Sequence, residues 1–275
     1  MGDIEGQTLL IEDFSAEGQV GRYVDLARRV AAANPDVIVV IGNELVPAVL
    51  SANRKIPVVA GMGYAVELGF AKSLSHPGGN LTGVNVYDVE TNGKLLQLLA
   101  EAVPSAARVG VLSTATTTFD VYRASLRDYA PKLGLSLIAP VLRDSTPSEI
   151  ERGFAELAQR HADALLIPPE VTFLGRIPLI VRLAAEHRLP AMYPFPPFSA
   201  AGGLMAYTFD PAEEGRYLAE DVHRILRGAK PGDIPIYQST RFRLTLNQNA
   251  AKAIGFAFPP EILARADEVI EEGNP

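Results

Sequence analysis

Short apolar segments that end in turns and lead into helical stretches recur along this 275-residue chain, and this alternation constrains the fold most. The clearest unit is the apolar run 37–41, which is followed by Gly42-Asn43 and a helical pattern over 44–52. A continuous apolar run of this length is typical of a strand covered on both faces. Strands that alternate with helices predict an α/β fold with parallel sheets and helices on both faces.

The same reading gives the expected elements along the chain. We expect strands at 7–14, 36–41, 57–60, 81–86, 108–112, 135–142, 164–167, 191–193, 204–207 and 241–246. We expect helices at 20–34, 44–52, 64–74, 91–102, 119–133, 148–160, 177–188, 211–226, 250–254 and 260–270.

Two runs of parallel strands meet near Val86, and the length suits two cores better than one. We therefore predict two doubly wound parallel-sheet lobes with a ligand cleft between them. Hinge crossings are expected near Val86-Tyr87, Phe209 and Tyr237. The expected lobes are 1–86 plus about 209–237 for the first, and 87–208 plus about 238–275 for the second.

Composition excludes several classes of function. The net charge of −7 argues against a nucleic-acid-binding surface. The absence of cysteine excludes thiolate nucleophiles and cysteine metal sites, and the four histidines show no metal-ligand spacing, so we expect no metal and no cofactor. No apolar run reaches the ~20 residues of a membrane helix. Residues 1–6 are short and acidic and do not read as an export signal.

Four segments together resemble a known family. They read Ser-Leu-Ser-His-Pro-Gly-Gly-Asn-Leu-Thr-Gly at 73–83, Ala-Gly-Gly-Leu-Met-Ala-Tyr at 201–207, Arg-Ile-Leu-Arg-Gly-Ala-Lys-Pro at 224–231 and Ala-Arg-Ala-Asp-Glu-Val-Ile at 264–270. The chain resembles the substrate-binding proteins of ABC uptake systems, in the group related to tryptophan- and phenylalanine-binding components. The resemblance implies a type 1 periplasmic-binding-protein fold, a periplasmic location, no catalysis, and delivery of a small molecule to an ABC permease in the membrane.

The resemblance begins at Gly6, and it implies an opening strand and helix that we expect this chain to lack. In a doubly wound lobe that strand would be central. We expect either that strand 7–14 pairs directly with strand 36–41, giving a four-stranded sheet with Leu9 and Ile11 beside Ile38 and Val40, or that a second molecule fills the gap and forms a homodimer through the first lobe.

Candidate ligand residues lie where strands end, because ligands of open parallel sheets sit at the carboxyl ends of the strands. Ser113, Thr114 and Thr116 precede a helix, whose free amides and hydroxyls suit a carboxylate; a simple helix cap is the equally weighted alternative. Gly42 and Asn43 hold the equivalent position in the first lobe, with a tight turn as the alternative.

Aromatic and turn residues complete the predicted ligand site, with core packing as the alternative role for the aromatics. They are Tyr64, Pro168, Tyr193, Phe195, Gly203 and Tyr207. We expect Glu170 and Arg176, which follow Pro168-Pro169, to lie on the solvated surface rather than in the site.

The ligand predicted from these residues is a small carboxylate such as an amino acid or an aromatic acid. Two other functions stay open. One is a cytoplasmic small-molecule sensor, which a missing export signal would favour. The other is a two-lobed α/β enzyme, although no Ser-His-Asp set or metal cluster is visible, and a two-thiol racemase mechanism is excluded.

Overall fold

The computed structural model describes residues 2–17 and 19–271, and the chain divides into two units. The first unit contains the residues up to Asp88 together with Pro211–Thr240. The second contains Val89–Asp210 together with the residues from Arg241 on. The chain therefore passes from one unit to the other three times.

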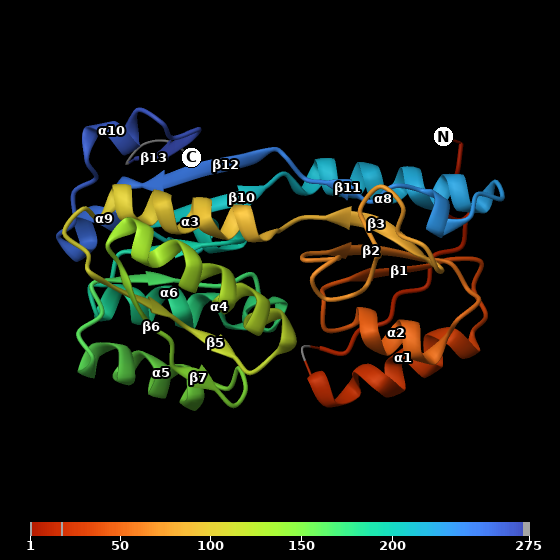
Figure 1. Cartoon of the computed structure of the whole chain (residues 1–275), viewed down its shortest axis with the longest axis horizontal. Coiled ribbons are helices and arrows are strands. Elements are labelled where there is room, and N and C mark those ends of the chain that lie inside the picture. Colours follow the sequence, from red (N-terminus) through yellow and green to blue (C-terminus); the bar gives the residue numbers. More distant parts are fainter. Residues whose placement is uncertain (1, 18, 272–275) are drawn as a thin grey trace. The chain divides into compact units, whose positions relative to one another are not determined.

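The first unit is built on a four-stranded parallel sheet in the order β1-β2-β3-β11 (Figure 1). Its register places Ile41 beside Gly61 and Gly61 beside Val84, so the first three strands end at one edge. The strands are β1 (Ile38–Ile41), β2 (Val58–Met62), β3 (Leu81–Asn85) and β11 (Tyr237–Gln238).

Helices cover this sheet on two sides. α1 and α2 bring Ala27, Val46 and Val49 against Ile38 and Val40 in one core cluster. α8 contacts β2 and β3, and Figure 1 shows it on the side of the sheet away from α1 and α2. The helical elements are η1 (Val20–Arg22), α1 (Tyr23–Ala32), α2 (Val46–Ala52), α8 (Pro211–Leu226) and η4 (Pro231–Asp233).

The expected strand at 7–14 is wrong. The amides of Gln7, Thr8 and Leu9 all donate to the Ile4 carbonyl, so the backbone closes on itself in a local turn instead of joining a ladder. Leu9 and Ile11, expected beside Ile38 and Val40, are not part of the core cluster that contains those two residues, and Ile11 is 50% exposed. The fourth strand of the sheet is instead β11, which pairs with β3.

The expectation that strand 36–41 is buried on both faces is also wrong. Among the described residues, β1 pairs with β2 alone. Its inward residues Ile38 and Val40 are buried, whereas Val39 and Ile41 are 52% and 51% exposed.

The second unit is built on a seven-stranded sheet in the order β13-β12-β10-β9-β8-β4-β6. Val111, Leu166 and Met192 are neighbours across β4, β8 and β9, so these strands also end at one edge. The strands are β4 (Arg108–Val111), β6 (Ser136–Ile138), β8 (Ala164–Leu166), β9 (Ala191–Tyr193), β10 (Met205–Phe209), β12 (Phe242–Asn247) and β13 (Glu268–Ile270).

A small parallel pair, β5 (Ser113–Thr114) with β7 (Val141–Leu142), lies beyond the ends of β4 and β6. The helical elements of the second unit are α3 (Val89–Ala102), α4 (Thr117–Tyr129), η2 (Ala130–Leu133), α5 (Pro147–Gln159), η3 (Val171–Arg176), α6 (Ile177–Glu186), α7 (Pro196–Ala200), α9 (Gln248–Ile254) and α10 (Pro260–Leu263).

Three further expectations are corrected. Residues 64–74 form turns rather than a helix, because Gly69 has φ +72° and the amides of Phe70 and Ala71 both return to the Ala65 carbonyl. The helix expected over 260–270 ends at Leu263, and Glu268–Ile270 pairs with β12 as a strand. β12 runs antiparallel to β10, so the second sheet is mixed rather than purely parallel.

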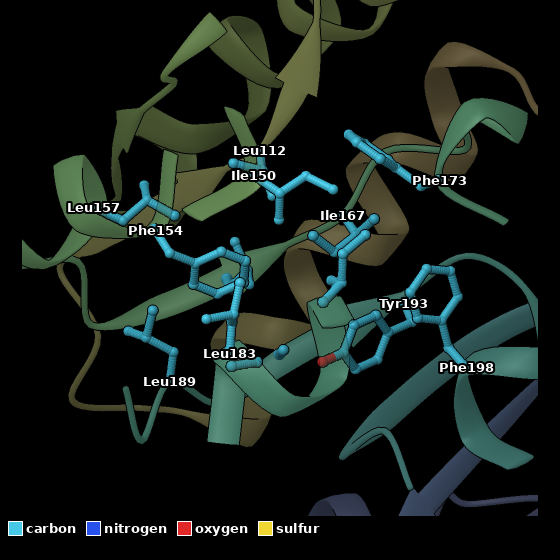
Figure 2. Close-up of a cluster of buried hydrophobic side chains, with 14 of the residues drawn as sticks. Leu112, Ile150, Phe154, Leu157, Ile167, Phe173, Leu183, Leu189, Tyr193 and Phe198 are labelled. Atoms are coloured by element: carbon cyan, nitrogen blue, oxygen red, sulfur yellow. The ribbon is translucent and has the colours of Figure 1, made fainter. Parts of the chain in front are cut away.

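The core of the second unit is a cluster of buried side chains from α5, α6 and the sheet (Figure 2). Phe154 and Ile180 lie among Leu157, Leu165 and Leu183 and are fully buried. Gly110 and Gly153 allow this close approach, since a Cβ at either position would lie within 3 Å of a leucine side chain.

We expect Phe154→Ala to lower the free energy of unfolding by about 3–5 kcal/mol, because it removes buried ring contacts and leaves a cavity. Chemical denaturation followed by circular dichroism measures this loss. The control is Leu174→Ala, at a side chain 43% exposed, which should change stability by less than about 0.5 kcal/mol. Equal effects of the two substitutions would contradict the packing described.

A second prediction concerns Asp221 on α8, which is 5% exposed. Burial raises the pKa of Asp221 to about 6, and the Arg224 guanidinium opposes the shift. In the unfolded chain the pKa of an aspartate is about 3.9. A carboxyl whose pKa is raised on folding contributes stability that is fully present below the unfolded-state pKa. This stability is lost as the pH rises through the folded-state pKa.

Asp221→Asn should therefore be more stable than the parent protein above pH ~6, by on the order of 1 kcal/mol after solvent screening. The difference should vanish below pH ~4. Melting temperatures measured from pH 4 to pH 8 test this. Glu220→Gln, next to Asp221 but at a side chain 31% exposed and paired with Arg216, is the control. A difference between Asp221→Asn and the parent that does not change with pH would refute the assignment.

Candidate functional site

In the first unit, three loops follow β1, β2 and β3 at the common edge of the sheet, and side-chain amides join them. Asn43 lies in the first loop, and its Oδ1 accepts a hydrogen bond from the Gly63 amide at 2.8 Å. Asn85 ends β3 and is buried; its Oδ1 accepts from the Ala65 amide at 2.9 Å, and its Nδ2 donates to the Tyr87 carbonyl. The side chains of Asn43 and Asn85 therefore hold the backbone of the loop that follows β2.

Tyr64 lies between Gly63 and Ala65, whose amides these side chains bind, and it is fully buried. Its φ of +56° is in the left-handed region, where a bulky residue is strained, and its amide donates to the Tyr87 carbonyl at 2.8 Å. Strained backbone of this kind clusters at ligand sites and persists only where the surroundings hold it. Here Asn43 and Asn85 hold the adjacent residues.

Tyr87 and Glu214 add ionisable groups near the same edge. Burial raises the pKa of the Tyr87 phenol, and the nearby Tyr64 and Glu214 raise it further. Burial also raises the pKa of the Glu214 carboxyl. A Cβ at Gly61 would meet Glu214 Oε1, so Glu214 on α8 lies directly over the end of β2.

In the second unit, the hydroxyl-rich turn after β4 is used largely by the protein itself. The Thr114 amide donates to Glu170 at 3.1 and 3.2 Å, and its hydroxyl donates to Glu170 Oε2 at 2.6 Å. Thr116 is the N-cap of α4, and its Oγ1 accepts from the Phe119 amide. In this arrangement Thr114 and Thr116 serve the turn and the helix start.

Glu170 is 1% exposed, so the expectation of a solvated surface position is wrong. The sequence pattern suggested a loop because Pro168 and Pro169 precede it. The structure places its carboxylate at the ends of β8 and β4, where Thr114 fixes it. Pro168 is buried beside it, and its carbonyl accepts the Glu170 amide at 2.8 Å.

The predicted aromatic residues are divided between the core and partly open positions. Tyr193 is 1% exposed and stacks on Phe198 at 4.6 Å inside the core cluster (Figure 2). Burial raises the pKa of the Tyr193 phenol. Phe195 is half-buried and packs against the same cluster. A Cβ at Gly203 would lie 2.9 Å from the Tyr193 ring, so the absence of a side chain at this position leaves room for the ring.

Tyr207 is half-buried on β10 and stacks on Phe242 of β12 at 5.1 Å. Burial raises the pKa of its phenol, and the carboxylate of Asp267 contributes. Gly42 has φ +102° and begins the turn after β1, with its amide on the Gly61 carbonyl at 2.9 Å. Within each unit, then, the sequence-predicted residues lie near strand ends, but Tyr193 and Gly203 also have clear packing roles.

Two residues at these edges were not among the predicted ligand residues: Asn85 and Glu170. Each is a polar residue at or just beyond the carboxyl end of a buried strand, and that position was the available signal. Among the described residues, no group of three or more His, Asp or Glu side chains is placed to hold a metal ion. None of the helices in the described part of the chain is both long and apolar enough to cross a membrane.

In each of the two α/β units, parallel strands end at one edge of that unit's sheet, and hydrogen bonds brace the loops that follow them. Such edges are where ligands of open parallel sheets bind. The chain belongs to the family of ABC transporter substrate-binding proteins, whose family model matches residues 2–270.

One relative and two solved structures are similar to this chain. A tyrosine-binding protein of Clostridioides difficile is 25% identical over 252 residues, covering 91% of this chain and 72% of that protein. A conserved domain protein from Vibrio cholerae is 24% identical, with a TM-score of 0.90 over 96% of this chain and 88% of that one. An ABC domain from Streptococcus pneumonia, in complex with L-Trp, is 22% identical, with a TM-score of 0.87 over 98% and 90%. The predicted fold class and family are thereby confirmed.

Ser113 gives a test of the site. Its Oγ is fully buried and has no hydrogen-bond partner within the ranges that the structure describes. An orphan buried hydroxyl costs about 1–3 kcal/mol. We therefore expect Ser113→Ala to leave the stability of the ligand-free protein unchanged or to raise it, as measured by urea denaturation.

The matched control is Ser125→Ala in the same unit. The Ser125 hydroxyl donates to the Tyr122 carbonyl at 2.7 Å and accepts from Asn92 Nδ2 at 2.8 Å. Its removal leaves buried partners unsatisfied and should cost about 1–3 kcal/mol. If Ser113→Ala loses as much stability as Ser125→Ala, the Ser113 hydroxyl has a structural partner and is not an open ligand contact.

Proposed function

We propose that this protein is the solute-binding component of an ABC uptake system and that its solute is an amino acid with an aromatic side chain. The family match over residues 2–270 carries this proposal. Two relatives support the ligand class, since one is a tyrosine-binding protein and another was solved with L-Trp. Its partners are then a small carboxylate ligand and a membrane permease, with no nucleic acid and no catalysis.

The ligand contacts are proposed at the carboxyl ends of the strands. In the first unit these are Gly42, Asn43 and Tyr64, whose loops Asn85 braces. In the second unit they are the following residues around the ends of β4, β8, β9 and β10: Ser113, Thr114, Thr116, Pro168, Tyr193, Phe195, Gly203 and Tyr207. The strained φ of Tyr64 and the orphan hydroxyl of Ser113 support a ligand role at these edges.

A location outside the cytoplasmic membrane follows from the same proposal, because an uptake system collects its solute there. The three passages of the chain near Asp88, Asp210 and Thr240 are the proposed hinge positions. We also propose that two copies pair through the first unit. Among the described residues β1 pairs with β2 alone, and Val39 and Ile41 of β1 are half exposed.

Titration calorimetry tests the ligand class. L-Tyrosine, L-tryptophan and L-phenylalanine should each be tested against L-serine, glucose and ribose. We expect saturable one-to-one binding of at least one aromatic amino acid, and a rise in melting temperature equivalent to about 2.7 kcal/mol at 100 times its Kd. Binding of a sugar with no response to any amino acid would overturn the proposal.

A further inference from the structure

Asn85 ends β3 and has hydrogen-bond partners in three separate segments of the first unit. Its Oδ1 accepts from the Ala65 amide at 2.9 Å, in the loop after β2. Its Nδ2 donates to the Tyr87 carbonyl at 3.1 Å and to Gln238 Oε1 at 2.6 Å. Asn85 is 2% exposed, so water has little access to these bonds. One buried amide group therefore connects a loop at the proposed solute edge with residues beside two of the passages of the chain between the units.

The partners fix the orientation of the Asn85 amide group. The Ala65 N–H can only donate and the Tyr87 carbonyl can only accept, so one of the two orientations of the amide satisfies both. The bond to Gln238 then uses the second Nδ2 hydrogen. Because the amide group is planar and rigid, a shift of one partner strains the bonds to the other two.

The Tyr64 backbone is the solute side of this network. Tyr64 is a proposed solute contact with a strained φ of +56°, and its amide donates to the same Tyr87 carbonyl at 2.8 Å. The next amide along the chain, that of Ala65, binds Asn85. A solute that shifts this backbone therefore acts on Asn85 from two sides, through the Tyr87 carbonyl and through Ala65.

The other side of the network is β11, in the segment Pro211–Thr240 that returns to the first unit. β11 has two residues, against five each in β2 and β3. Besides the ladder with β3, the Ser239 amide donates to the Asn85 carbonyl at 2.9 Å, and Gln238 accepts from the Asn85 side chain. Elements held by few bonds open locally at low cost, so the bond to Gln238 is a substantial part of what holds the chain just before it passes to the second unit.

We propose that Asn85 is a positioning residue through which solute contact at Tyr64 sets the state of β11 and of the chain passage after it. The inference rests on the proposed function and adds to it the route by which an occupied site acts on that passage. Coupling between two sites is reciprocal, so a loosened Gln238 also loosens the loop around Ala65 when no solute is present.

The ligand-free protein tests this coupling, with substitutions at the half-buried Gln238 rather than at buried Asn85. Gln238→Met keeps the length of the side chain but removes the acceptor of Asn85. Hydrogen exchange of the Ala65 amide, followed by NMR, should then become at least about tenfold faster. Gln238→Ala, which also lacks the acceptor, should show the same increase, whereas Gln238→Glu keeps an acceptor oxygen and should retain the parent rate. Circular dichroism verifies that each variant is folded.

Thr82→Val is the matched control, because it also removes a buried bond between β3 and the returning segment. The Thr82 hydroxyl donates to the Ile234 carbonyl at 2.9 Å and has no bond to Asn85 among those described. This substitution should leave the exchange rate of the Ala65 amide unchanged. An unchanged rate in Gln238→Met, or an equal increase in Thr82→Val, overturns the inference.

Saturation with L-tyrosine or L-tryptophan tests the solute side. In the parent protein we expect slower exchange at both Ala65 and Ser239, and in Gln238→Met slower exchange at Ala65 alone. If neither amino acid binds the parent, the proposed function fails and the inference falls with it. If one of them binds and Gln238→Met still shows solute-dependent protection at Ser239, the role of Asn85 is refuted while the proposed function stands.

Discussion

The parallel hydrogen-bond register is the constraint on which the rest of this structure depends. In the first unit it aligns Ile41, Gly61 and Val84, and in the second it aligns Val111, Leu166 and Met192. Neighbouring parallel strands all end at the same edge of the sheet. The pairing of the strands therefore brings the loops that follow them close together, and no contact between the loops is needed for this. Residues as distant in sequence as Thr114 and Glu170 therefore meet.

Ends of buried strands leave backbone amides that must be satisfied, and polar side chains supply the acceptors. Asn43 and Asn85 do this for two amides of the loop after β2, and Glu170 does it for the Thr114 amide beyond β4. The same side chains fix the geometry of the edges. A loop held by buried hydrogen bonds is a preorganised surface, which lowers the ordering cost of binding a small solute.

The sequence was sufficient for the elements that local chemistry determines. Long helices such as 211–226 follow from periodicity and from the residues that end them, and the apolar strand expected at 57–60 is found at Val58–Met62. It was insufficient where a local bond competes with a ladder, as at Thr8, whose amide turns back to Ile4. It also failed at Glu268–Ile270, where pairing with β12 overrides a helical pattern, and at Glu170, whose burial depends on a partner 56 positions away.

Aromatic residues show why a binding site cannot be read from residue type alone. Tyr193 and Tyr207 both lie at the end of short apolar runs. Tyr193 is buried against Phe198 and Gly203, whereas Tyr207 is half-buried against Phe242. The difference arises from what packs across the sheet, which no local pattern encodes. Charge is more informative, because a buried carboxylate must be compensated wherever it lies.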